Sequence, residues 1–302
     1  MSAAFGDRLA AAVAAHGPLC VGIDPHAGLL AQWGLDDDAA GVRSFGLTVV
    51  EQLAGKVAAL KPQSAFFERH GSRGVAALED VLAAAREAGV LTVLDVKRGD
   101  IGSTMGGYAA AYLDDASPLR ADSITLSPYL GLGSLNPALE LARQTGRGAF
   151  VLALTSNPEG ASVQHARTGE RSVAASIVAG LAELNDAERA EGTTWGSFGV
   201  VVGATIGEAA QTTGTDLPAL HGPILAPGVG AQGAGPEDLQ RVFGAALPYV
   251  LASSSRGVLK HGPAGLAQAA QAEAAAMRAV VAQAAGGAAT SATQTAIQGG
   301  AK

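Results

Sequence analysis

The stretch LDVKRGDIGST, residues 94–104, concentrates side chains that are suited to acid–base chemistry. Asp95, Lys97 and Asp100 follow one another closely, directly after the apolar run VLTV. Charges at the core-facing end of a strand cost free energy unless they are paired. Asp95 and Lys97 share one face, because side chains alternate along a strand. Opposite charges that keep each other ionised in a partly dry pocket are one explanation, and a purely structural ion-pair network is the other.

Eight short apolar runs predict the strands that would position these charges, and most are followed by an Ala/Leu-rich helical pattern. The runs are LCVGID (19–24), VAALKPQ (57–63), VLTVLDVK (90–97), DSITLS (122–127), AFVLALT (149–155), FGVVVGAT (198–205), PILAPG (223–228) and PYVLASS (248–254). Strands that alternate with helices indicate parallel βαβ units, whose buried strands are continuous apolar runs. Eight such units in roughly 250 residues predict an α/β (β/α)8 barrel. The alternative, an open doubly wound sheet, would call for a G-x-G-x-x-G motif after the first strand, which the chain lacks.

Helices are predicted near residues 3–16, 39–55, 74–88, 105–115, 135–145, 170–191, 236–245 and 264–284. The segment 156–196 is longer than a barrel connection requires, and its polar part SNPEGASVQHARTGE predicts an extended, mobile loop after the fifth strand. Residues 1–285 are predicted to form one barrel domain. The tail at 286–302 has a small, polar composition without a period and is predicted to be disordered.

The composition favours a small-molecule ligand. The 302 residues carry a net charge of −7, only 16% are charged and no basic block occurs, so neither nucleic acid nor a membrane surface is predicted as a partner. The single cysteine, Cys20, excludes an internal disulfide and a cysteine-built metal site, and favours a cytoplasmic location. The N-terminus predicts an amphipathic helix rather than a signal peptide, and no apolar segment reaches membrane-spanning length without interruption.

Polar residues fall at the carboxyl ends of the predicted strands, which is where (β/α)8 barrels carry their chemistry. In chain order they are Asp24, Lys61, Asp95, Lys97, Ser127, Thr155, Gly228, Gly230 and Arg256. Some also have structural explanations: Asp24 and Ser127 precede prolines and fit turns, and the Lys61 side chain could extend out of a strand end. No histidine has a partner at metal-ligand spacing, so no metal site is predicted.

The loop PGVGAQGAGPED (227–238) places four glycines between a predicted strand and a helix. Backbone N–H groups of such a loop can bind an anion, and Arg256 in the run SSSRG adds a full positive charge. A merely flexible loop is the alternative. Since the loops after strands seven and eight of barrels frequently bind phosphate, the two features together predict a phosphorylated ligand.

These motifs resemble the orotidine 5′-phosphate decarboxylase family, in its longer bacterial branch. Residues 94–104 are similar to the family's Asp-x-Lys-x-x-Asp-Ile signature, and further family motifs are matched by VGIDPH, LKPQSAFFERHG, LSPYLG, SNP and APGVGAQG. The resemblance extends from about residue 5 to about residue 280. It implies the conversion of orotidine 5′-monophosphate to UMP and CO2, the last step of pyrimidine synthesis, without a cofactor or a metal.

The resemblance also implies roles for individual residues. Loss of CO2 leaves a poorly delocalised carbanion, which must be stabilised by fixed charges and protonated, and Lys97 fits the proton donor. Asp95 would lie beside the substrate carboxylate, while Lys61 and Asp100 would complete the alternating charges and contact the ribose. The implied substrate-binding residues are Asp24 on the ribose, Ser127 on the pyrimidine edge, Gly228, Gly230 and Arg256 on the phosphate, and Gln232 between phosphate and base.

In the family the second Asp of the signature, the following Ile and a nearby Thr enter the neighbouring subunit's site. Here these residues are Asp100, Ile101 and Thr104, so the resemblance implies a homodimer with shared active sites. Two other functions remain open. A Mg²⁺-dependent sugar-phosphate decarboxylase or aldolase of the same suprafamily would need an acidic ligand in place of Lys61. A non-catalytic nucleotide-binding barrel would bind UMP without turning over the substrate.

Overall fold

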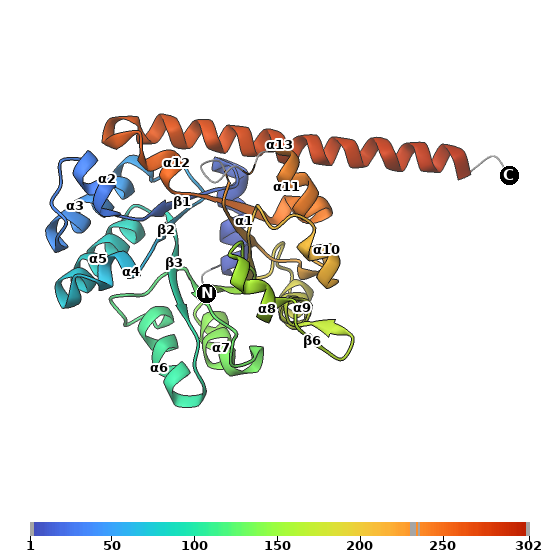
Figure 1. The fold of residues 1–302 in the computed structure, drawn as a ribbon, viewed down its shortest axis with the longest axis horizontal. Coiled ribbons are helices and arrows are strands. Elements are labelled where there is room, and N and C mark those ends of the chain that lie inside the picture. The colour runs from blue at the N-terminus through green and yellow to red at the C-terminus, as the bar shows by residue number, and fades with distance from the viewer. Residues whose placement is uncertain (1–2, 230–233, 235, 300–302) are drawn as a thin grey trace.

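The computed structural model describes residues 3–229, 234 and 236–299, and its centre is a closed parallel barrel (Figure 1). The barrel order is β1-β10-β9-β8-β5-β4-β3-β2. The strands are β1 (Leu19–Ile23), β2 (Ala59–Pro62), β3 (Leu91–Arg98), β4 (Ser123–Leu126), β5 (Gly148–Leu154), β8 (Phe198–Val202), β9 (Ile224–Pro227) and β10 (Val250–Ser254). Each strand falls on one of the apolar runs, and the predicted (β/α)8 barrel is confirmed.

Helices alternate with these strands and surround the barrel (Figure 1). The longer ones lie where helices were predicted: α1 (Phe5–His16), α3 (Ala39–Leu53), α5 (Gly71–Glu87), α6 (Gly102–Leu113), α7 (Asn136–Gln144), α9 (Val173–Ala190), α11 (Pro236–Phe243) and α13 (Gly262–Gly299). Short helices too brief to show a period were not predicted: α2 (Ala27–Gln32), α4 (Ala65–Glu68), α8 (Ala161–Gln164), α10 (Ala209–Thr213) and α12 (Arg256–Leu259). The described residues also include four 3-10 segments: Leu132–Leu135, Pro158–Gly160, Pro218–Leu220 and Gly244–Tyr249.

Helix α3 illustrates how the local sequence produces these elements. Asp38 precedes it, and the Asp38 side chain accepts a hydrogen bond from the backbone N–H of Gly41 at 2.8 Å, which satisfies one free donor of the first turn. Val42, Phe45 and Val49 recur at helical spacing and are fully buried. The apolar stripe thus fixes which face of α3 packs inward.

Helix α1 closes the amino end of the barrel. Its Phe5 and Leu9 are fully buried against the apolar interior, and the Phe5 ring meets Phe150 of β5 edge to face, with centroids 6.1 Å apart. Cys20 of β1 lies in the same apolar cluster, and burial raises the pKa of its thiol to about 12. Apolar side chains therefore fill the amino end of the barrel, and a ligand must enter from the carboxyl ends of the strands.

The segment after β5 contains more regular structure than the predicted mobile loop. It includes the short helix α8 and an antiparallel hairpin of β6 (Arg167–Thr168) and β7 (Arg171–Ser172), which stands outside the barrel (Figure 1). Gln164, the last residue of α8, holds this segment to the barrel: its Oε1 accepts the backbone N–H of Thr155 at 2.9 Å. The mobility of the segment stays a prediction.

Helix α13 packs along the barrel and then continues beyond it to Gly299 (Figure 1). Residues 286–299, expected from their composition to lack regular structure, thus belong to the helix. The division into a barrel domain of residues 1–285 and a separate tail stays a prediction. Among the described residues, no helix combines the length and the apolar character needed to cross a membrane.

Candidate active site

A cavity lies directly above an apolar layer inside the barrel. The layer takes one residue from each of seven strands: Cys20, Ala59, Val93, Phe150, Val201, Leu225 and Leu251. Residues two positions further along each strand face the same interior, because side chains alternate. These residues are Gly22, Lys61, Asp95, Leu152, Gly203, Pro227 and Ser253, and all but Gly22 line the cavity. Along each strand, the inward-facing residue of the apolar layer is thus followed, two positions later, by an inward-facing residue at the level of the cavity.

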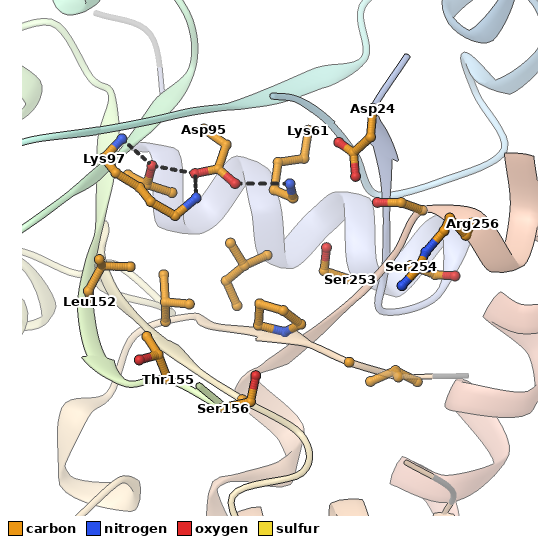
Figure 2. A pocket seen from close by; sticks show the side chains of 18 of the residues that line it. Asp24, Lys61, Asp95, Lys97, Leu152, Thr155, Ser156, Ser253, Ser254 and Arg256 are labelled. Carbon is orange, nitrogen blue, oxygen red and sulfur yellow. Dashed lines mark hydrogen bonds and ion pairs between the residues drawn. The ribbon is translucent and has the colours of Figure 1, made fainter. Parts of the chain in front are cut away.

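The cavity measures about 500 Å³ and is open at the carboxyl ends of the strands, where the sequence predicted the site (Figure 2). Six of the predicted site residues line it: Asp24, Lys61, Asp95, Lys97, Gly228 and Arg256. Its volume falls in the range of about 300–1,000 Å³ that is typical for small-molecule sites. Within the described part of the chain, no group of three His, Cys, Asp or Glu side chains is arranged to hold a metal ion.

Lys61, Asp95 and Lys97 form a contiguous charged array (Figure 2). Asp95 Oδ2 accepts a hydrogen bond from Lys61 Nζ at 3.1 Å, and Asp95 Oδ1 accepts one from Lys97 Nζ at 2.6 Å. The side chains of Lys61 and Asp95 are 7% and 8% exposed, whereas that of Lys97 is 46% exposed. Lys97 is therefore the most exposed member of the charged array.

The opposite charges of the array keep its buried members ionised. Burial raises the pKa of Asp95, but the charges of Lys61 and Lys97, with hydrogen bonds from Lys97 and Thr125, outweigh it and lower the pKa to about 2. Burial lowers the pKa of Lys61, but the carboxylates of Asp24 and Asp95 outweigh it and raise the pKa above its usual range. Both side chains thus stay charged at neutral pH.

Asp95 should therefore make stability depend on pH in the acid range. A carboxyl whose pKa falls on folding stabilises the protein above its unfolded pKa, and loses that contribution as the pH falls through the folded value. The free energy of unfolding of the wild type minus that of Asp95→Asn should be constant above about pH 5 and shrink by roughly 2 kcal/mol from about pH 4 to pH 2. Urea unfolding of both proteins measures this difference at each pH at which the wild type is folded.

Asp36→Asn, at an exposed position, is the matched control for loss of a carboxyl. The same pH profile for both substitutions would contradict a role of the charged array in holding Asp95 ionised.

Asp24 lines the cavity and carries one carboxylate oxygen without a hydrogen-bond partner among the described residues. This oxygen, Oδ1, is buried, and Figure 2 shows the carboxylate beside Lys61. Gly22 leaves room for this arrangement, because a Cβ there would collide with Ser255 Oγ and lie 3.2 Å from Asp24 Oδ1. A buried acceptor without a partner costs free energy until a donor reaches it. Because Asp24 lines the cavity, its carboxylate can accept a hydrogen bond from a ligand hydroxyl.

The backbone at Lys97 adopts an unusual conformation. Its φ is +45°, in the left-handed region that costs a non-glycine residue roughly 1–2 kcal/mol. The pairing of β3 with β4 also shifts register between Leu94 and Arg98. These two features shape the end of β3, where the Lys97 ammonium meets Asp95; residue spacing predicted the shared face but not the irregular backbone.

Arg98 anchors the chain directly after the charged array. Its Nη2 donates to Glu68 Oε1 at 2.7 Å and to the Tyr112 hydroxyl at 3.2 Å, and its guanidinium lies 5.5 Å from the centre of the Tyr108 ring. These contacts tie β3 to α4 and α6. The sequence analysis gave Arg98 no role, because its partners on α4 and α6 become its neighbours only in the folded chain.

Asp100, Ile101 and Thr104 do not line this cavity. They lie in the connection from β3 to α6 and in the first turn of α6, and Asp100 Oδ1 accepts the backbone N–H of Ile101 at 2.8 Å. Ile101 is 62% exposed. All three thus lie outside the lining of this chain's own cavity, and their predicted role depends on a second subunit.

Ser127 also lies outside the cavity lining, while Thr155 and Ser156 lie within it. Ser127 follows the end of β4, and its backbone N–H is bonded to the carbonyl of Arg98 at 2.8 Å. The contact of Ser127 with a pyrimidine edge stays a prediction. Thr155 and Ser156 belong to the run LTSNP, which begins at Leu154, the last residue of β5, on the same rim.

The side of the cavity predicted to bind phosphate is formed by Gly228 and Arg256. Gly228 has a φ of +98°, which lets the chain turn directly after β9. Arg256 begins α12, is exposed, and has no ion-pair partner among the described residues. The predicted contacts Gly230 and Gln232 lie outside the described residues.

The protein is a parallel (β/α)8 barrel with a charged array at the carboxyl ends of its strands, which is the architecture of the barrel enzymes. Within it, the chain belongs to the orotidine 5′-phosphate decarboxylase / HUMPS family, whose sequence profile matches residues 17–272. The family resemblance found in the sequence is thereby confirmed.

Similar proteins agree with this family. Orotidine 5′-phosphate decarboxylases from Streptomyces coelicolor and Salinispora arenicola are each 60% identical over 260 residues, covering 86% of this chain and 91% of theirs. The crystal structure of a proposed orotidine 5′-phosphate decarboxylase from Streptomyces avermitilis has a TM-score of 0.87 at 58% identity, covering 93% of this chain and 97% of that one. The Leishmania donovani OMP decarboxylase has a TM-score of 0.70 at 30% identity, covering 92% and 98%.

Proposed function

We propose that the protein converts orotidine 5′-monophosphate to UMP and CO2, the last step of pyrimidine synthesis. The observation that carries the proposal is the charged array of Lys61, Asp95 and Lys97 at the floor of a nucleotide-sized cavity. The named activity of relatives that are 60% identical supports it. The charged array itself supplies both the acid and the electrostatic field, so no cofactor or metal has a part in the proposal.

The chemistry that such an array can perform is the stabilisation and protonation of a carbanion. When the bond from C6 to the carboxylate carbon breaks, its electron pair stays on C6 and CO2 leaves. The Lys97 ammonium stabilises this developing charge and then transfers a proton from Nζ to C6. Asp95, held 2.6 Å from Lys97 Nζ, aims that ammonium at the reacting carbon and lies beside the departing carboxylate.

Binding of the rest of the nucleotide falls to the other side chains of the cavity. Asp24, with its unused buried oxygen, accepts a ribose hydroxyl, and Lys61 beside it donates to another. The Arg256 guanidinium and the backbone at Gly228 hold the phosphate. Ser156 lines the cavity directly after β5, and its hydroxyl is suited to hydrogen-bond the base, whereas the Thr155 hydroxyl already donates to Asn157 Oδ1 and accepts from Gln164 Nε2. Binding energy from the remote phosphate then contributes to positioning the reacting ring.

One ultraviolet assay tests this function directly. Incubation with orotidine 5′-monophosphate should change the absorbance to that of UMP, at a rate that EDTA does not alter. A Mg²⁺-dependent sugar-phosphate enzyme would require a cation beside the Lys61 ammonium, where it would be repelled, and it would be EDTA-sensitive. A non-catalytic barrel would bind UMP and leave the absorbance unchanged for hours. Either of these results would overturn the proposal.

We also propose that the active site is shared between two subunits of a homodimer. Ile101, Tyr129 and Leu130 are 62%, 78% and 53% exposed, and they follow the adjacent strands β3 and β4. Large exposed apolar side chains near one another are typical of an interface. Asp100 and Thr104 lie on the same connection as Ile101, so dimerisation through this surface would carry them toward the partner's cavity.

Mixing two inactive variants should test the shared site. In a hybrid of Lys97→Ala and Asp100→Ala, one site keeps both residues and the other lacks both. Random subunit exchange makes half of the dimers hybrid, so activity should recover to roughly one quarter of wild type. The matched control is Lys97→Ala mixed with Asp95→Asn, whose altered residues belong to one site and should give no recovery. Failure of the first mixture, with exchange verified by mass spectrometry, would place Asp100 in its own chain's site.

The proposed location is the cytoplasm. It rests on the composition of the chain, whose one cysteine is buried and unpaired.

A further inference from the structure

Thr125 places one buried hydroxyl between two members of the charged array. Its Oγ1 donates a hydrogen bond to Asp95 Oδ1 at 2.8 Å and accepts one from the backbone N–H of Lys97 at 2.9 Å. Thr125 is 1% exposed and lines the cavity. Its hydroxyl has a single hydrogen, so donation to Asp95 leaves a lone pair for Lys97 and fixes the hydroxyl in one orientation. One atom therefore links the carboxylate to the backbone that carries the ammonium.

The irregular pairing of β3 and β4 explains why a side chain performs this task. Leu94 pairs with Ile124 and Arg98 pairs with Leu126, so β3 carries extra residues opposite Thr125. Extra residues in a bulge lose their regular ladder partners. The Thr125 hydroxyl replaces the missing acceptor for the Lys97 N–H, at the one residue of β3 whose backbone is left-handed.

We propose that Thr125 is a positioning residue, which holds Asp95 and the Lys97 backbone so that the Lys97 ammonium is aimed at the reacting carbon. The proposal rests on the proposed decarboxylase function. Thr125 acts through the charged array and needs no contact with the nucleotide. Its loss should therefore slow the chemical step and leave nucleotide binding nearly unchanged, because Asp24, Gly228 and Arg256 lie elsewhere in the cavity.

Thr125→Val tests the proposal, since valine keeps the shape of the side chain and removes the hydroxyl. We expect kcat to fall by roughly 10- to 100-fold, the size of effect that a misplacement of about 1 Å can cause. The KM and the Kd for UMP should stay within about threefold of wild type. Thr125→Ser, which restores the hydroxyl, should recover most of the lost kcat.

The matched control is Ser123→Ala on the same strand. Ser123 is fully buried, and its Oγ donates to the carbonyl of Thr92 at 3.2 Å, away from the charged array. The Ser123→Ala variant shows the effect of losing a buried hydroxyl from β4 that does not contact the charged array. Its kcat should stay near that of the wild type. A kcat for Thr125→Val that equals that of Ser123→Ala, or a serine variant as slow as the valine variant, would overturn the proposal.

Amide hydrogen exchange at Lys97 provides a readout that does not depend on turnover. Exchange of this N–H should be accelerated in Thr125→Val and not in Thr125→Ser or Ser123→Ala, because only valine removes its acceptor. Unchanged exchange in the valine variant would overturn the proposal, and Thr125→Ala replaces that variant if it does not fold. A wild type that never turns over orotidine 5′-monophosphate would instead overturn the proposed function, and the exchange data would still decide whether Thr125 holds Lys97.

Discussion

Lys97→Ala should abolish decarboxylation, with a loss of at least roughly 10⁴-fold, because it removes the side chain that we propose as both the proton donor and the positive charge that stabilises the carbanion. The variant should remain folded, since Asp95 keeps its bonds to Lys61 and Thr125 and is not left as an unpaired buried charge. UMP should still bind, because the residues proposed for the ribose and phosphate are unchanged. Turnover of orotidine 5′-monophosphate, UMP titration and thermal unfolding measure the three expectations.

The control for Lys97→Ala is Lys56→Ala. Lys56 lies outside the cavity, and its Nζ donates to the backbone carbonyl of Gln52 at 2.6 Å. Its loss changes the net charge of the protein by the same amount and should leave the rate near wild type. Near-normal turnover by a folded Lys97→Ala enzyme would remove Lys97 from the mechanism.

Arg256→Ala should lower kcat/KM for orotidine 5′-monophosphate by roughly 10²- to 10³-fold, or about 3–4 kcal/mol, as expected for loss of a charge-assisted phosphate contact. The guanidinium is exposed at the start of α12 and has no ion-pair partner among the described residues, so folding should not suffer. With the nucleoside orotidine the loss should be much smaller, because that ligand has no phosphate. Parallel kinetics on the two substrates measure the difference.

Lys260→Ala provides the matched control for Arg256→Ala. Lys260 is an exposed cation at the end of α12, outside the cavity lining, so its removal should affect neither substrate. Equal losses on nucleotide and nucleoside for Arg256→Ala would mean that Arg256 acts elsewhere than on the phosphate.

The barrel and most of its charged rim could be predicted from local patterns in the sequence. Each strand is a short apolar run, and a parallel strand has its carboxyl end on the same side of the barrel as every other strand. Asp24, Lys61 and Asp95 were therefore expected on one rim before any distance was known. Chain direction alone decides this, and chain direction is part of the sequence.

The positions at which the strands end determine which hydroxyl side chains line the cavity. Ser127 and Thr125 are two residues apart in sequence and share one face of an ideal strand. Since β4 ends at Leu126, Ser127 leaves that alternation, while Thr125 stays inside. Ser156 enters the cavity from the connection after β5. A strand boundary predicted to within a few residues cannot separate such cases, because a shift of one residue exchanges the two faces.

The charged array itself exists only in the closed barrel. Lys61 and Asp95 are 34 residues apart in the chain, and Lys97 turns toward Asp95 because its backbone is left-handed and its N–H is held by Thr125. Sequence spacing placed the three charges on neighbouring strands and suggested that they pair, but it did not give the geometry of the pairs. Pairing depends on burial, on the register between β3 and β4, and on hydrogen-bond distances across strands, and these arise only when the tertiary structure removes the ions from water.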